Sequence, residues 1–326
     1  TLWSALAGYW YLTPFLLFVH GTFGTFLINA VHELCHNSVF KRKWLNELFV
    51  RIFSFLGWHD WVHFNASHAN HHRYTLHPPR DGEVVLPIMW LTRQNFWKSA
   101  ICNWRGPLNS FKGSIKKMRG QWDDDWSLKL FPKDKAKACQ ALMQWNRVLV
   151  VGHSLVLAAS VIAALVTLQW AWLLVPLLVS FSNNYGGALF FFCNNTQHVG
   201  LTDKVPDFRL CCRSMMLPRF VSFLYWNMEY HTEHHMYAAV PCYNLRKLQK
   251  TIAHDLPEPK GMLGTWKEIE MILKRQKGEP DYQYIHPLPA TAHPAVLGIR
   301  EEEIAAGAAP TDAMADCGIL DLAAAS

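Results

Sequence analysis

Several features of common protein classes are missing from this sequence. Its eight cysteines form no CxxC pair, so the sequence supports neither a disulfide framework nor a rubredoxin-like centre. Charged residues make up only 17% of the 326 residues, and no nucleic-acid-binding motif accompanies the net charge of +6. Nucleic acid is therefore a poor partner for the basic residues. The apolar opening stretch has no small-residue cleavage pattern, so we do not interpret it as a signal peptide.

Hydrophobic residues are abundant and unevenly distributed. They form 51% of the chain, yet the mean hydropathy is only +0.01, which indicates a membrane protein with a large aqueous part. The predicted spans cover about 8–31, 148–168 and 171–193, and the last two form a hairpin. Lys41-Arg42-Lys43 after the first span places that end in the cytosol. We therefore expect a multi-pass, integral membrane, all-α helical bundle whose cytosolic cap is built from residues 37–146 and 194–293. Residues 294–326 read as a weakly ordered tail.

Histidines in three clusters are the main chemical signal. His231-Thr232-Glu233-His234-His235 repeats the HxxHH pattern of His68-Ala69-Asn70-His71-His72, and His32 and His36 add a third pair. Spacings of three and four residues lie on one face of a helix, whereas adjacent residues diverge by about 100°. The adjacent histidines can therefore serve neighbouring ions. Eight or nine ligands are too many for one ion, and they suit two ions with positions left open for a reactant.

Other residues accompany these clusters. Asn194 and His198 lie one helical turn apart where the last predicted span ends, and either is a candidate for the metal shell. Four acidic residues beside predicted ligands are candidates to orient imidazole N–H groups: Glu33, Asp60, Glu229 and Glu233. Four aromatic residues are candidates to line a substrate slot, although aromatics at a membrane interface need no such role: Trp58, Trp61, Tyr225 and Trp226. Lys116, Lys117 and Arg119 are candidates to bind an acidic head group or redox partner.

The three clusters together resemble the histidine boxes of the membrane fatty acid desaturase superfamily, which includes acyl and sphingolipid desaturases, alkane hydroxylases and carotenoid ketolases. HxxxH at 32–36 and HxxHH at 68–72 and 231–235 carry the resemblance. The Asn194-x3-His198 element is similar to the additional metal-site element of acyl-CoA desaturases. The resemblance covers about residues 31–256.

The resemblance implies a non-haem di-iron centre that uses O2 and two external electrons to abstract hydrogen from an unactivated C–H bond of a long acyl or alkyl chain. A second abstraction gives an alkene, and oxygen transfer gives an alcohol instead. It implies nine metal ligands: His32, His36, His68, His71, His72, His198, His231, His234 and His235. The membrane would be the bacterial inner membrane or the endoplasmic reticulum.

The sequence departs from the family pattern in some places. It has no HPGG segment of a fused cytochrome b5 domain and no rubredoxin cysteines, so the electron donor is expected to be a separate protein of the cytochrome b5, ferredoxin or rubredoxin type. The first box has three intervening residues, where acyl-CoA desaturases usually have four. We favour a desaturase, with a hydroxylase or monooxygenase of the same superfamily as the alternative.

Two other classes compete with this interpretation. His32-Glu33-Leu34-Cys35-His36 also reads as HExxH, the zinc metalloprotease motif in which the glutamate is the general base. A protease would leave both HxxHH boxes and His198 unexplained. A metal transporter would place its polar ligands near the middle of the membrane, whereas these histidines lie outside the predicted spans.

Overall fold

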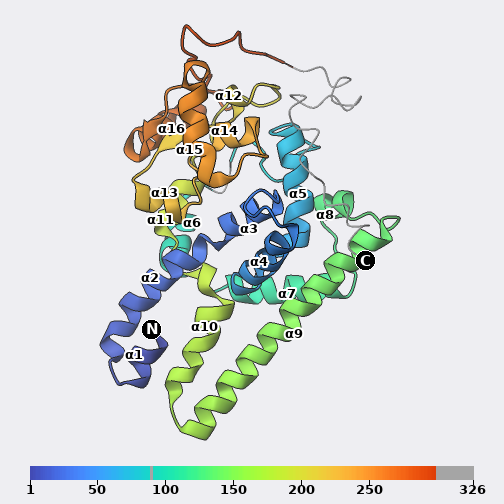
Figure 1. Cartoon of the computed structure of the whole chain (residues 1–326), viewed down its shortest axis with the longest axis vertical. Coiled ribbons are helices and arrows are strands. Elements are labelled where there is room, and N and C mark those ends of the chain that lie inside the picture. The colour runs from blue at the N-terminus through green and yellow to red at the C-terminus, as the bar shows by residue number, and fades with distance from the viewer. Residues whose placement is uncertain (89–90, 299–326) are drawn as a thin grey trace.

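The computed structural model describes residues 1–88 and 91–298 of the chain, and these residues are mostly helical with almost no strand (Figure 1). Most of the predicted tail at 294–326 lies outside the described residues. The helices of the first half are α1 (Leu2–Leu6), η1 (Trp10–Leu12), α2 (Thr13–Thr25), α3 (Leu27–Cys35), α4 (Lys43–Leu56), α5 (Trp61–Tyr74), α6 (Arg93–Ala100), α7 (Gly106–Met118), α8 (Asp125–Leu130) and α9 (Ala136–Thr167). Those of the second half are η2 (Trp170–Leu173), α10 (Leu174–Ser180), η3 (Ser182–Asn184), α11 (Ala188–Asn194), α12 (Phe208–Cys211), α13 (Arg219–Leu224), α14 (His231–Met236), α15 (Cys242–Ile252), η4 (Ala253–Asp255) and α16 (Met262–Gln276). Two short strands, β1 (Met215–Met216) and β2 (Lys260–Gly261), pair in parallel.

Two helical stretches of the described chain are long and apolar enough to cross a membrane, Trp10–Cys35 and Ala136–Thr167. Much of the surface of α9 is apolar and exposed; for example, Leu155 is 65% and Val166 78% exposed. A continuous exposed apolar surface of this kind needs an apolar partner. In Figure 1, α9 and α10 run side by side and meet in a turn at the bottom, far from the C-terminal helices at the top.

The second arm of this hairpin differs from the single helix predicted over 171–193. The structure divides it into η2, α10, η3 and α11. Ser182 and Asn183 cause the interruption, because their side chains donate hydrogen bonds to the carbonyls of Leu56 (2.9 Å) and Gly57 (2.7 Å) instead of continuing an apolar surface. The interruption therefore fastens the hairpin to the corner where α4 ends and α5 begins.

The same corner divides the stretch between Trp44 and Phe64 into two helices. Helix α4 ends at Leu56, Trp58 takes a positive φ of 50°, and α5 starts at Trp61. Asp60 caps α5 by accepting a hydrogen bond from the backbone N–H of His63 (3.2 Å), which satisfies one of the free donors of the first turn. The cap fixes where α5 begins and hence which way its histidines face.

A buried apolar core holds α3, α5 and α9 together. Val31, Leu34, Val62 and Leu149 belong to it and are at most 4% exposed. On α2, Gly24 allows a close approach of the hairpin, because a Cβ there would lie 2.4 Å from the carbonyl oxygen of Ser182. This packing sets the histidine-bearing ends of α3 and α5 against each other.

Candidate metal centre

Four segments of the chain bring the nine predicted histidine ligands together. His32 lies on α3 and His36 is the residue that caps its C-terminus, while His68, His71 and His72 lie on α5. The third box, from His231 to His235, forms α14, and His198 follows α11. All nine residues are buried except His36, which is partly exposed. Histidines up to about two hundred residues apart in the sequence are therefore brought together by the packing of these segments.

The nine histidines form two groups. The first contains His32, His36, His68, His72 and His234, and the second contains His71, His198, His231 and His235. Within each group, one ring nitrogen from every residue lies within 4.8 Å of the others. Each HxxHH box is shared, since its two adjacent histidines point into different groups. This is the divergence of about 100° expected of neighbours on a helix.

The facing atoms are the Nε2 nitrogens. In the first group, Nε2 of His68 lies 3.2 Å from that of His36 and 2.9 Å from that of His72, and Nε2 of His72 lies 3.1 Å from that of His234. In the second group, Nε2 of His231 lies 2.9 Å from that of His198 and 3.1 Å from that of His235. Two imidazole nitrogens bound at right angles about 2.1 Å from one ion would be about 3.0 Å apart. The donor set therefore fits a metal ion in each group.

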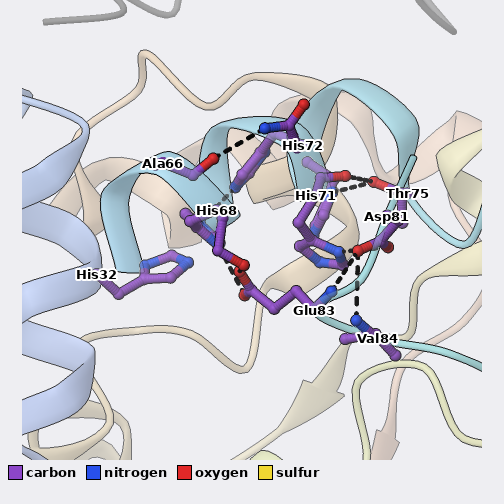
Figure 2. Close-up of polar contacts among 12 residues, drawn as sticks. His32, Ala66, His68, His71, His72, Thr75, Asp81, Glu83 and Val84 are labelled. Carbon is purple, nitrogen blue, oxygen red and sulfur yellow. Dashed lines mark hydrogen bonds and ion pairs between the residues drawn. The ribbon is translucent and has the colours of Figure 1, made fainter. Parts of the chain in front are cut away.

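Two carboxylates that the sequence analysis missed hold the second box. Asp81 accepts a hydrogen bond from Nδ1 of His71 (2.8 Å), and Glu83 accepts one from Nδ1 of His68 (2.9 Å). Figure 2 shows both side chains pointing from the loop after α5 toward these rings. Asp81 also accepts from the backbone N–H groups of Leu76 (2.9 Å) and Glu83 (2.9 Å). The sequence does contain a sign of these partners, because two acidic residues follow the second histidine box closely in Asp81-Gly82-Glu83.

Further partners fix the orientation of other rings. Glu33 accepts from Nδ1 of His32 (3.0 Å) and lies 3.6 Å from Nδ1 of His234. The carbonyl of Cys211 accepts from Nδ1 of His198 (2.8 Å), and the hydroxyl of Thr75 lies 3.2 Å from Nδ1 of His235. A partner on Nδ1 leaves the Nε2 lone pair free for a metal and keeps the ring from rotating.

The remaining acidic candidates serve other parts of the fold. Asp60 pairs with Lys117 (2.9 Å) and accepts from Asn146 (2.9 Å). Glu229 accepts from the Ser222 hydroxyl and Glu233 from the Ser214 hydroxyl. Among the described residues, none of these three carboxylates hydrogen-bonds a predicted ligand. Asn194 ends α11 one turn before His198, and its amide makes no hydrogen bond with a histidine in the described chain.

The four aromatic candidates are packed into the core. Trp58 stacks on His153 at 4.0 Å and donates to Ser114 (3.1 Å), and Trp61 meets Trp145 edge to face at 6.1 Å. Tyr225 is fully buried, with its hydroxyl accepting from Gln197 (2.9 Å). Trp226 meets Phe53 at 6.2 Å. These contacts give each ring a packing role.

Burial keeps most of the cluster neutral. It lowers the pKa of His36 and of His198 to about 3, helped by neighbouring histidines. Burial, followed by mutual repulsion, holds the pKa well below the usual value in five more: His68, His72, His231, His234 and His235. For His71, burial is outweighed by Asp81 and Glu83, and the pKa is raised. Neutral imidazole is the form that binds metals.

A helical chain with two membrane-length apolar helices and two buried all-histidine groups defines a histidine-box metalloprotein. The chain belongs to the fatty acid desaturase family, whose model matches residues 7–265. The match extends beyond both ends of residues 31–256, where the sequence resemblance lies, and supports an oxidoreductase of the desaturase and hydroxylase type. No curated protein and no solved structure matched the chain.

The two carboxylates after α5 allow the groups to be weakened separately. We expect Asp81→Ala to lower the metal affinity of the four-histidine group by about 10–100-fold, because His71 loses its orienting partner. Glu83→Ala should act on the five-histidine group through His68. Metal titration followed by mass spectrometry of the intact protein measures both. Asp125→Ala, at an exposed carboxylate at the start of α8, is the control. Equal loss from both groups in either variant would contradict the assignment.

The lowered histidine pKa values predict how the stability of the metal-free protein depends on pH. Below about pH 6.5 the unfolded chain protonates these residues and the folded chain does not, so each removes about 1.4 kcal/mol of stability per pH unit. Glu83 and Glu233, whose pKa burial raises to about 7, oppose this between about pH 4.5 and 7. His71, whose pKa is raised above 6.5, opposes it only above pH 6.5, so the opposing groups are fewer. The thermal midpoint should therefore fall between pH 7 and 5.5. A midpoint that stays constant or rises would refute this account.

Proposed function

We propose that this chain is an O2-dependent membrane di-iron oxidoreductase that desaturates a long acyl or alkyl chain. The observation that carries the proposal is the pair of adjacent groups of five and four histidines built from shared boxes. Imidazole is a good ligand for iron. Five and four nitrogen donors leave each six-coordinate ion with room for a reactant, as a reaction at the metal requires.

We propose all nine histidines named by the sequence resemblance as metal ligands. The five histidines of the first group would bind one ion, and the four of the second group would bind the other. The division supports two ions over one, since each box gives residues to both groups. It also argues against a zinc protease, because the HExxH pair His32 and His36 lies among five histidines instead of completing a small site of its own. Glu33 is engaged with His32, so it holds a ligand instead of facing a water molecule.

In the proposed centre, bound iron and the protein side chains would have separate roles. Bound iron would supply the reduction of O2 that drives hydrogen abstraction from the substrate. Overall, the substrate loses two hydrogens, and two electrons and two protons complete the conversion of O2 to two waters. The protein holds the rings through Asp81, Glu83 and Glu33 and surrounds them with buried side chains, which keep bulk water away.

We further propose that residues 1–293 form one multi-pass domain with the histidines on the cytosolic side. Support comes from the two membrane-length helices, from the hairpin that returns toward its starting side and from the basic segment Lys41-Arg42-Lys43 at the start of α4. The substrate would enter from the bilayer. The electrons would come from a separate carrier of the cytochrome b5, ferredoxin or rubredoxin type.

Product analysis tests this proposal. The detergent-purified chain, loaded with iron and supplied with a reductant, O2 and a lipid extract, should hold about two irons and yield a product lighter by two hydrogens. His234→Ala should lower turnover by more than about 100-fold, because it removes a ligand. His254→Ala, at an exposed histidine, should leave turnover unchanged. A product heavier by one oxygen would assign a hydroxylase, and one bound zinc without oxygen consumption would exclude the di-iron proposal.

A further inference from the structure

A groove on the surface of the C-terminal helices is lined almost entirely by positive charge. Four cationic residues and one tyrosine enclose a hollow of about 350 Å³ between α13 and α15: Arg219, Tyr243, Arg246, Lys247 and Lys250. All five side chains are exposed, and no acidic residue lines the hollow. Within the described chain, none of the four cations forms an ion pair. The groove therefore presents a strongly positive field to any molecule that approaches it.

This groove contrasts with the basic cluster that the sequence suggested for an acidic partner. Lys116 pairs with Asp123 (3.4 Å) and Lys117 pairs with Asp60 (2.9 Å), so two of these cations already have carboxylate partners within the chain. The groove between α13 and α15 is the stronger candidate for binding an anionic surface.

The inner face of α15 lies directly against the metal centre. Leu245 is fully buried and packs with Tyr230, which immediately precedes the third histidine box. The thiol of Cys242 interacts with the Glu33 carboxylate, which in turn contacts His32 and His234. One helix thus separates the basic groove from the five-histidine group. A donor seated in the groove would deliver electrons over a short path.

We propose that this groove docks the acidic face of a soluble one-electron carrier protein, an inference that rests on the proposed oxidoreductase function. The reaction consumes two electrons per turnover, so two reduced carriers would each be oxidised by one electron. Complementary charge speeds such transient encounters. Redox interfaces of this kind are small, which suits a hollow of this size.

The position of the groove favours a protein over a lipid surface. Exposed aromatic side chains flank the cations, including Tyr243 (60% exposed) and Phe220 (63%), and would add contact area of the kind that protein interfaces use. In Figure 1, α15 lies in the upper part of the molecule, at the opposite end from the turn between α9 and α10. This placement puts the groove on the side away from the apolar hairpin.

Charge reversal in the full-length, iron-loaded protein tests the docking. We expect Arg246→Glu, Lys247→Glu and Lys250→Glu together to slow electron transfer from the reduced soluble domain of cytochrome b5, or from a reduced [2Fe–2S] ferredoxin, by at least about 10-fold at low salt. Stopped-flow oxidation of the carrier measures this rate. The strong salt dependence of the unaltered protein should disappear. Replacement of the same residues by Gln should have an intermediate effect.

The control carries an equal change of charge elsewhere. Lys133→Glu, Lys135→Glu and Lys137→Glu alter three exposed lysines near the start of α9 and should leave the carrier rate unchanged. Iron content and reduction by dithionite should be the same in every variant, which shows that the centre is intact and separates a docking defect from a folding defect.

The outcomes separate this proposal from the proposed function. If dithionite-driven turnover gives product but charge reversal leaves the carrier rate unaltered, the docking site is wrong and the oxidoreductase stands. The same conclusion follows if neither carrier reduces the unaltered protein. If charge reversal instead abolishes binding to vesicles of phosphatidylcholine with phosphatidylserine, the groove is a lipid-binding face. If dithionite-reduced protein yields no product, the proposed function itself fails.

Discussion

The crowding of nine buried imidazoles is the constraint on which the rest of the structure depends. Their Nε2 atoms face one another at 2.9–3.2 Å in five pairs. In several of the rings, Nδ1 forms a hydrogen bond with a carboxylate or a backbone carbonyl. Neutral nitrogens that all turn their lone pairs inward repel one another unless a cation lies between them. A bound metal ion would relieve this repulsion, whereas protonation is disfavoured by burial. Burying the imidazoles also costs desolvation free energy, and the packing of α3, α5 and α14 offsets that cost.

The remaining architecture can be understood as support for those rings. Helix α5 has a defined start, because Asp60 caps it, and its histidines are held at the far end by Asp81 and Glu83. The interrupted arm of the hairpin joins the α4–α5 corner through Ser182 and Asn183. This links the membrane-length α9 to the element that bears the second box. Helix α15 completes the enclosure, with one face against Glu33 and Tyr230 and the other carrying the basic groove.

Part of this arrangement could be predicted from the sequence. The spacing of His68, His71 and His72 and of His231, His234 and His235 indicates helices, and adjacent histidines on a helix must diverge, so two neighbouring groups of histidines could be predicted. The division into five and four was not, because it depends on how α3 and α14 cross α5. Asp81 and Glu83 were missed because they lie in an irregular loop, where only their closeness to the second box in the sequence, and no periodicity, points to a partner. The prediction of a single helix over 171–193 was wrong because the side chains of Ser182 and Asn183 bond to another part of the chain, a tertiary contact that hydropathy does not reveal.

The most direct test of the central claim is an anomalous difference map of the iron-loaded protein, recorded at the iron absorption edge. The account predicts two peaks, one among His32, His36, His68, His72 and His234 and the other among His71, His198, His231 and His235. A single peak, or peaks away from these residues, would show that the convergence of the nine rings has another cause.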